Sequence, residues 1–543
     1  MAVSINEQPI IKRLVTAGNN DIFYEDLDVA AGTMTELDTS SGAIDTSDQL
    51  TMAAAFQKVF IANGANLKVA DFINTKLTVT ALTTAPTRGA TVTQVTSGAT
   101  MIVDYVNTAK TLIYGYVTSG TFTTTAGHTL SGGSMDPTTR VPSAVTANPH
   151  WDDWTVYPGG SSGAMPAKAY LICVYRGRIV LSGNPRYPHQ WFMSKVADPF
   201  DWSYGTDDPM SAVAGNDADA GQSPDIVRAL ISFHDDYLIF GCASTIWLLR
   251  GDPVAGGSLD NLSDTTGMFG ANSWCFDDAR NLYFWGSGGL YEIKSDFSGI
   301  RNLTEMVLPD IINDEAADPS THRITMGYDK KRHGIVVAIT VLATGVNSNY
   351  FYSFKTQGFY PESYPNECGP YSLFYYDAND TTYADLLVGC KDGYIRKFLT
   401  TAKDDDVGAT DDAISSYVTY PITPLAARMN RDGTLAPYED QNGKLTELVF
   451  DLAGGAAGGD AGDTDGVTYE LHKGDDAETV LEAIVDGDTA FSTAALSGTG
   501  RKNKIRPRMR GAYMGLKLYN STASETWAIN RVLYGTQKAG RVR

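Results

Sequence analysis

The stretch "RGRIVLSGNP" (176–185) has the form of one β-strand with a turn at each end. A polar turn leads into four apolar residues, and small residues followed by a proline end the run. Short apolar runs between turn signals are typical of buried strands. The same pattern recurs along the chain at "QKVFIANG" (57–64), "RGRIVLSG" (176–183), "DDYLIFGC" (235–242), "ARNLYFWG" (279–286), "RHGIVVAI" (332–339) and "ADLLVGCKDG" (384–393).

The spacing of these strand cores predicts the fold. After a long first interval, successive copies follow one another at about 45–60 residues, the size of a four-stranded propeller blade. Further strands follow several of the cores, such as "STIWLLRGDP" (244–253) and "GGLYEIKSD" (288–296). A single β-sandwich is the alternative, but it has fewer strands than six such units supply. We therefore expect an all-β chain with a β-propeller of six or seven blades.

The long first interval and the chain ends predict further parts. Residues 77–133 alternate Thr and Val between turn signals, which indicates an inserted small β-module. The propeller would then comprise 51–76 and 134–400. Residues 1–50 read as a polar N-terminal arm. After residue 400, acidic and Gly/Asp loops alternate with longer strands, so 401–543 is expected to form a sandwich-like C-terminal β-domain.

Composition limits the class of protein. The 543 residues are 43% hydrophobic and 19% charged, with a formal net charge of −21. This favours a globular protein, and a sequence-reading DNA binder is disfavoured because phosphates would be repelled. No apolar run is long enough to span a membrane, and no signal peptide is recognisable. The five cysteines are far apart in apolar runs, which indicates buried, reduced thiols in a protein assembled in the cytoplasm.

Motifs for catalysis and metal binding are missing from the sequence. There is no phosphate loop, HExxH, GxSxG or strand–GxGxxG–helix unit, and the seven histidines are dispersed. Two aspartate groups, Asp460–Asp463–Asp465 and Asp404–Asp406 with Asp411 and Asp412, could bind calcium but lack the EF-hand register. Solvated loops are the better interpretation. We predict no enzyme activity, no cofactor and no metal.

A glycan function is the alternative. A propeller glycan hydrolase would need two carboxylates about 5–10 Å apart in one pocket. A glycan-binding protein could stack sugars on exposed aromatic side chains such as Trp151, Trp154 and Trp191. Core packing is the more common role of such tryptophans.

One basic segment contrasts with the acidic chain. The stretch "RKNKIRPRMR" (501–510) contains six basic residues and no acid: Arg501, Lys502, Lys504, Arg506, Arg508 and Arg510. Such a segment could dock on an acidic neighbour or touch DNA phosphates. It could equally be an exposed strand with basic residues on its solvent face.

At "WFMSKVADPFDW" (191–202) a family resemblance emerges. The segment resembles the tubular tail, or nozzle, proteins of short-tailed bacteriophages, whose pattern is a strand, a Ser-x-x-x-Asp-Pro-x-x-Trp/Phe turn and a strand pair. The matching residues are Ser194, Asp198, Pro199 and Trp202. The insert around 91–106 is similar to small β-modules of phage structural proteins, and 504–535 resembles the terminal strands of the same tail proteins.

The resemblance implies a structural role in a virion tail. It implies a hexameric ring of propeller subunits below the portal and adaptor proteins, around a channel that retains and then releases the genome. Genomic DNA would pass without sequence-specific binding. The 77–133 insert departs from a plain propeller and could decorate the outside or contact a tail fibre.

Overall fold

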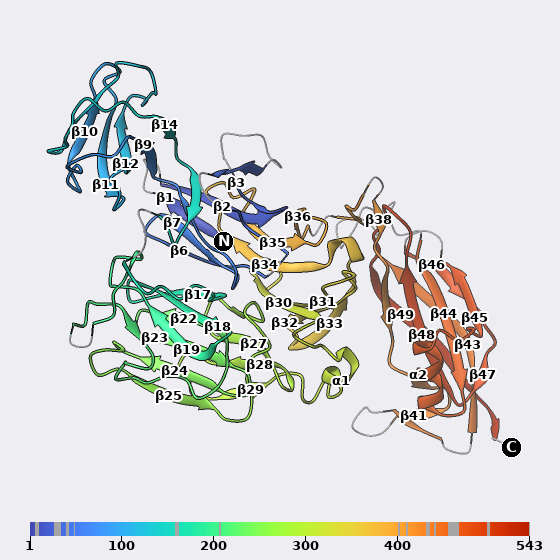
Figure 1. Cartoon of the computed structure of the whole chain (residues 1–543). Coiled ribbons are helices and arrows are strands. Elements are labelled where there is room, and N and C mark those ends of the chain that lie inside the picture. Colours follow the sequence, from blue (N-terminus) through green and yellow to red (C-terminus); the bar gives the residue numbers. More distant parts are fainter. Residues whose placement is uncertain are drawn as a thin grey trace. The chain divides into compact units, whose positions relative to one another are not determined.

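The computed structural model is built almost entirely from β-strands (Figure 1). It describes residues 1–5, 10–25, 34–39, 43–47, 49–157, 162–205, 208–399, 402–408, 411–429, 435–438, 441–453, 466–496 and 500–541. Two compact units result: the larger contains 1–362 and 368–398, and the smaller contains 363–367 and 399–543.

Seven successive sheets, antiparallel apart from one short parallel pair in the second, make up most of the larger unit, counted over the described residues. The first three sheets contain β1 (Ala2–Ile5), β2 (Ile11–Gly18), β3 (Asp21–Glu25) and β4 (Met34–Glu36); β5 (Asp38–Thr39), β6 (Thr51–Ala55), β7 (Lys58–Ala62), β8 (Leu67–Asp71) and β15 (His150–Asp153); and β17 (Leu171–Tyr175), β18 (Arg178–Asn184), β19 (Tyr187–Met193) and β21 (Val213–Ala214). A short parallel pair, β16 (Ser162–Gly163) and β20 (Asp201–Trp202), lies outside them.

The remaining four sheets follow the same plan. They contain β22 (Val227–His234), β23 (Tyr237–Cys242), β24 (Ile246–Arg250) and β25 (Ser258–Ser263); β26 (Trp274–Phe276), β27 (Leu282–Gly286), β28 (Gly289–Ile293) and β29 (Ile300–Asn302); β30 (His322–Asp329), β31 (Gly334–Val341), β32 (Asn347–Ser353) and β33 (Gly358–Glu362); and β34 (Pro370–Tyr376), β35 (Asp385–Cys390) and β36 (Ile395–Lys397). The short helices α1 (Ile311–Glu315) and η1 (Asn366–Cys368) lie between sheets.

The repeated strand cores of the sequence are the second strands of the second to seventh sheets. They correspond to β7, β18, β23, β27, β31 and β35. Every residue of β7 and β27 is buried, because the middle strands of a blade are covered on both faces by the neighbouring blades. The β-propeller fold expected from the sequence is confirmed.

The first strands of the sheets lie side by side around a common axis. Strand β17 contacts both β6 and β22, and β30 contacts both β26 and β34. The ring closes between the seventh and the first sheet, where Leu14 packs in one cluster with Tyr376. The Tyr376 hydroxyl donates to the Lys12 carbonyl at 3.2 Å, and Lys12 pairs with Asp377 at 2.6 Å.

The N-terminal fifty residues differ from the arm expected from the sequence. Their described parts contain β1 to β5, and β1 to β4 form the first blade. Val15 and Ile22 are completely buried in one cluster with Val59 of the second sheet. The arm prediction did not recognise this blade because polar stretches separate its strands and only Leu14 and Val15 of the eight residues of β2 are buried.

The insert is larger than the 77–133 expected from its composition. Its six-stranded sheet contains β9 (Asn74–Thr78), β10 (Thr91–Gln94), β11 (Thr100–Val106), β12 (Leu112–Ser119), β13 (Leu130–Gly132) and β14 (Ala144–Thr146). It has its own core, which includes Leu77, Val92 and Ile113. Strands β8 and β15, which flank it, pair with each other in the second sheet. The module therefore emerges between two adjacent blade strands.

The smaller unit is a two-sheet sandwich. One sheet contains β39 (Ser416–Thr419), β40 (Thr423–Pro424), β44 (Thr468–Gly474), β45 (Ser492–Ala495) and β48 (Tyr513–Asn520), and the other contains β43 (Gln441–Leu452), β46 (Gly500–Ile505), β47 (Arg510–Gly511) and β49 (Ile529–Arg541). Their facing side chains share a core that includes Leu448, Phe450 and Leu518. Helix α2 (Ala477–Val485) packs on β44 and β48.

Small hairpins complete this unit, namely β37 (Asp404–Asp405) with β38 (Asp412–Ala413) and β41 (Ala427–Met429) with β42 (Leu435–Pro437). In neither unit is any described helix both long and apolar enough to cross a lipid bilayer.

Candidate functional site

The motif Ser194–Asp198–Pro199–Trp202 forms a turn that leads from the end of β19 into β20. The Ser194 hydroxyl accepts a hydrogen bond from the Ile179 amide at 3.0 Å, and the Asp198 carboxylate accepts one from the Phe200 amide at 3.1 Å. The Pro199 carbonyl accepts the indole N–H of Trp202 at 3.1 Å. Ser194 and Trp202 are completely buried. The motif is therefore architectural in its contacts and offers no open site.

The three tryptophans considered for sugar stacking are all buried. Trp151 is 2% exposed, and Trp154 and Trp191 are fully enclosed. Trp154 also donates to the Pro199 carbonyl at 3.3 Å, so it packs against the same turn. They belong to the core, as the more common role of such residues suggested.

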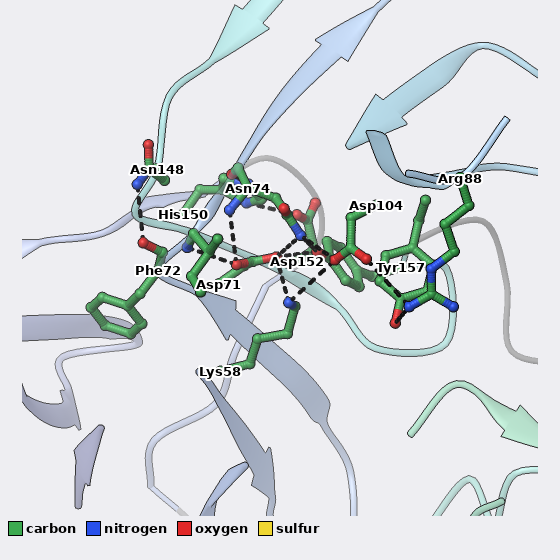
Figure 2. Close-up of polar contacts among 12 residues, drawn as sticks. Lys58, Asp71, Phe72, Asn74, Arg88, Asp104, Asn148, His150, Asp152 and Tyr157 are labelled. Carbon is green, nitrogen blue, oxygen red and sulfur yellow. Dashed lines mark hydrogen bonds and ion pairs between the residues drawn. The ribbon is translucent and has the colours of Figure 1, made fainter. Parts of the chain in front are cut away.

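A buried network of charged groups joins the insert to the second sheet (Figure 2). Lys58 of β7 lies 3.4 Å from Asp71 at the end of β8 and 3.8 Å from Asp104 of β11. Asn74, the first residue of the insert, donates to both carboxylates at 3.0 Å. The network thus connects a blade strand with two strands of the inserted module.

Asp71 is the centre of this network. Burial alone would raise the pKa of its carboxyl group, but Lys58, His150 and the Tyr157 hydroxyl outweigh burial and hold that pKa below its usual value. The Tyr157 hydroxyl donates to Asp71. Burial, reinforced by the Asp71 charge, raises the pKa of Tyr157 well above its ordinary value.

A second set of contacts lies beside it. His150 is completely buried, with Nδ1 2.9 Å from the Asp152 carboxylate and Nε2 3.0 Å from the Asn74 carbonyl. Lys76 of β9 pairs with Asp152 at 3.1 Å. Because each buried charge has a partner, the arrangement fixes the insert on the propeller and keeps the cost of burial low.

Sequence reasoning missed this network. Its members come from five strands and the segment after β15, separated by up to a hundred residues, and no spacing rule connects them. The dispersed pattern of the seven histidines did not indicate that His150 would be completely buried. A charged residue inside an otherwise apolar strand core, as Lys58 is in "QKVFIANG", was the one available signal.

The basic segment 501–510 runs through β46 and into β47 of the sandwich. The side chains of Arg501 and Lys502 lie outside the described residues. The other four basic residues, Lys504, Arg506, Arg508 and Arg510, are exposed. Asn503 and Met509, between them, are buried. Lys504 and Arg510 therefore lie on β46 and β47, and Arg506 and Arg508 lie on the segment that joins these strands.

The charges of this surface are only partly balanced. Lys504 pairs with Glu447 of β43 at 2.6 Å, and this hydrogen bond together with the nearby Arg506 lowers the pKa of Glu447. Arg531 of β49 pairs with Asp451 at 3.2 Å. The sequence from 501 to 543 contains eleven basic residues and one acidic residue. We call Lys504, Arg506, Arg508 and Arg510 the basic edge.

The remaining candidates can be placed as well. Asp460, Asp463 and Asp465 lie outside the described residues. Asp404 binds the Ser524 amide at 2.6 Å, and Asp405 and Asp412 face each other in the β37–β38 hairpin. Within the described ranges, no three His, Cys, Asp or Glu side chains are grouped to hold a metal ion. All five cysteines are buried.

Comparisons with known proteins add no family. No family model matches the chain, and no curated protein is similar to it. Among solved structures, it is similar to PorZ, an essential bacterial surface component of the type-IX secretion system of Porphyromonas gingivalis, at 11% identity and a TM-score of 0.30, over 97% of this chain and 65% of PorZ.

Two further solved structures have the same level of similarity. A quinonprotein alcohol dehydrogenase-like protein from Bacteroides thetaiotaomicron is 12% identical, with a TM-score of 0.26, over 62% of this chain and 72% of its own. An oligogalacturonate lyase in complex with manganese is 11% identical, with a TM-score of 0.24, over 59% of this chain and 84% of its own. At these scores the similarities carry no argument about function.

Proposed function

We propose that this chain is a non-enzymatic structural protein of a phage virion, a tail nozzle or tubular tail subunit. Copies would form a closed ring, six by the family resemblance, around a channel for genome retention and ejection. The ring would dock on the adaptor and portal proteins of the tail.

The observation that carries the proposal is the basic edge. Four cationic side chains are exposed within seven residues, on β46, β47 and the segment between them, in a chain whose net charge is −21. Such a surface is complementary to the acidic remainder of a neighbouring copy or to an acidic adaptor, and complementary charges set the register and speed of association. A cyclic ring requires two different contact surfaces on each subunit, and this separation of charge supplies them.

The acidic surface of the rest of the chain would also suit a channel through which DNA passes. A surface with excess carboxylates offers DNA phosphates no counter-charges, so the duplex stays mobile. The buried Ser194–Trp202 turn supports the same proposal. Its residues, which resemble the tail family, pack inside the subunit, as we expect of a protein with a structural role.

Charge reversal tests the proposal. The variant Lys504→Glu/Arg506→Glu/Arg508→Glu is compared with Lys294→Glu/Arg301→Glu/Lys355→Glu, which reverses three exposed cations of the propeller. Analytical ultracentrifugation of each protein, alone and with the purified adaptor, measures assembly. We expect the basic-edge variant to associate at least about tenfold more weakly than wild type, while the control assembles normally. Equal assembly of both variants, or no assembly of the wild type with itself or the adaptor, would contradict the proposal.

A further inference from the structure

The propeller contains a small cavity at one end of its axis. The cavity has a volume of about 240 Å³ and is lined by residues from five consecutive sheets. The polar side chains among them are Gln49, Tyr170, Arg228, Asn272, His322 and Arg323. Tyr170 directly precedes β17, Arg228 is the second residue of β22, and His322 begins β30. These residues therefore lie at the N-terminal ends of the first strands of the sheets, which surround the axis and converge at one end of the propeller.

The charge of this cavity is opposite to that of the chain. Arg228 and Arg323 supply its positive charge, and no lining residue is acidic. Within the part of the chain that the structure describes, neither guanidinium has a carboxylate at ion-pairing distance. The exposed Asp318 carboxylate interacts electrostatically with His322 and Arg228, and its oxygen Oδ1 accepts from the Ser320 amide at 2.7 Å and hydroxyl at 2.6 Å.

Arg323 is held in place without an anion. Its guanidinium stacks on the Tyr371 ring at 4.8 Å, which orients the planar fork. Burial lowers the pKa of Arg323, a sign that the cation is partly removed from water. A desolvated guanidinium gains most from a carboxylate or phosphate, because these match its fork geometry.

Two other contacts orient side chains that line the cavity. The His322 Nδ1 atom accepts the Asp318 amide at 3.2 Å, so the ring proton lies on Nε2, where it remains a hydrogen-bond donor. The Tyr170 hydroxyl contacts the Val227 carbonyl at 3.4 Å, which fixes its ring beside the cavity. Phe269 adds a second aromatic ring to the lining.

We propose that this cavity binds a small carboxylate-bearing ligand of the size of an acidic monosaccharide. Arg228 and Arg323 would hold the carboxylate, and Tyr170 and Phe269 would contact the ring. The volume is below the roughly 300–1,000 Å³ of pockets for drug-sized molecules, so one sugar unit suits it better than a long chain. This goes beyond the nozzle proposal and does not depend on it.

A second hollow of the propeller lacks these features. It is larger, at about 380 Å³, and lies along β25, β28 and β29. Its one ionisable lining residue is Asp264. It has no cation to hold an anion, and so the axial cavity is the stronger candidate for a ligand site.

Isothermal titration calorimetry of the full chain tests the assignment. Sodium glucuronate is the probe, glucose is the matched sugar without a carboxylate, and sodium phosphate is the anion without a sugar. Wild type is compared with Arg228→Gln/Arg323→Gln and with Arg186→Gln, an exposed arginine of the third sheet. Circular dichroism establishes that each variant is folded, and Arg323→Lys gives a second, milder change of the same site.

We expect glucuronate to bind the wild type and Arg186→Gln equally, and the double variant about ten to a hundred times more weakly. Arg323→Lys should lie between them, because lysine keeps the charge and loses the fork. Equal binding of glucuronate and glucose would remove the carboxylate from the proposal. Binding of phosphate without glucuronate would contradict the sugar part, and no binding of either anion, or unchanged binding by the double variant, would overturn the site.

Discussion

Positive charge occurs in two contrasting regions of this molecule. In the junction of the insert with the second sheet, the side chains of Lys58 and Lys76 are 6% and 7% exposed and face buried carboxylates. At the basic edge of the sandwich, the Lys504 side chain is 42% exposed and its partner Glu447 is 43% exposed. The same residue type therefore serves internal structure in one region and a surface in the other.

The difference follows from solvation. A buried lysine without its carboxylate leaves an uncompensated charge in a poorly polarisable environment, so the pair must stay together. An exposed lysine is hydrated with or without a partner, so it is free to exchange an internal contact for an intermolecular one. Substitutions should consequently affect stability in the first region and association in the second.

Removing the central carboxylate should have the largest effect. Asp71→Ala leaves Lys58 with only the more distant Asp104 and removes the acceptor of Asn74 and Tyr157. We expect the free energy of unfolding to fall by about 3–5 kcal/mol. Urea denaturation followed by tryptophan fluorescence measures it. A loss below about 1 kcal/mol would mean that the junction does not depend on this charge.

Arg178, in the strand core "RGRIVLSG" (176–183), offers a second test. It is completely buried, and its guanidinium donates to the carbonyls of Ser194, Ser211 and Pro209. Arg178→Lys keeps the charge but cannot reach all three acceptors, so we expect a loss of about 1.5–3 kcal/mol in the same denaturation assay. An unchanged midpoint would show that the fork geometry is dispensable.

The depressed pKa of Asp71 predicts a pH dependence. Its carboxyl is harder to protonate in the folded state than in the unfolded chain, so its contribution to stability is complete above the ordinary value of 3.8 and is lost as pH falls through the lower folded pKa. The unfolding free energy of wild type should therefore decrease more steeply below pH 3.8 than that of Asp71→Asn. Parallel pH profiles would contradict the assignment.

An exposed pair supplies the matched comparison. Lys12 and Asp377 lie 2.6 Å apart, with side chains 31% and 72% exposed. Because water screens this pair, Lys12→Met should cost no more than about 1 kcal/mol in urea denaturation. A loss of unfolding free energy as large as that of Asp71→Ala would show that burial does not explain the difference between this exposed pair and the buried Lys58–Asp71 pair.

The smallest effect on stability is expected at the basic edge. Lys504→Ala should change the unfolding free energy by no more than about 0.5 kcal/mol, because both partners of the Lys504–Glu447 pair are substantially exposed. Differential scanning calorimetry measures this. A large loss would make Lys504 a structural residue and remove it from the proposed docking surface.

The sequence predicted the propeller because its second strands carry an unbroken apolar signal. It did not identify the first blade, although "IKRLVTAG" in β2 has a similar form, because only Leu14 and Val15 of that strand are buried. The alternation of Thr and Val identified the insert but not its bounds. Its first strand, β9, begins three residues before the predicted residue 77, and its last strand, β14, ends after the predicted residue 133, since both strands have mixed compositions.

The sites were harder to predict than the fold. The sequence left two interpretations of the basic edge open, a docking surface and an exposed strand, and its four side chains are exposed. The Asp71 network and the axial cavity could not be predicted, because each depends on which strands of distant segments become neighbours. Arg228 and Arg323 are unremarkable in the sequence and meet only because the inner strands share an axis.

Electron microscopy of the purified chain mixed with its adaptor tests the central proposal most directly. A nozzle subunit should give class averages of closed rings around a central channel, stacked on the adaptor, and the Lys504→Glu/Arg506→Glu/Arg508→Glu variant should give few. Single particles of the wild type that never form a ring or join the adaptor, at concentrations where the adaptor itself assembles, would contradict the account.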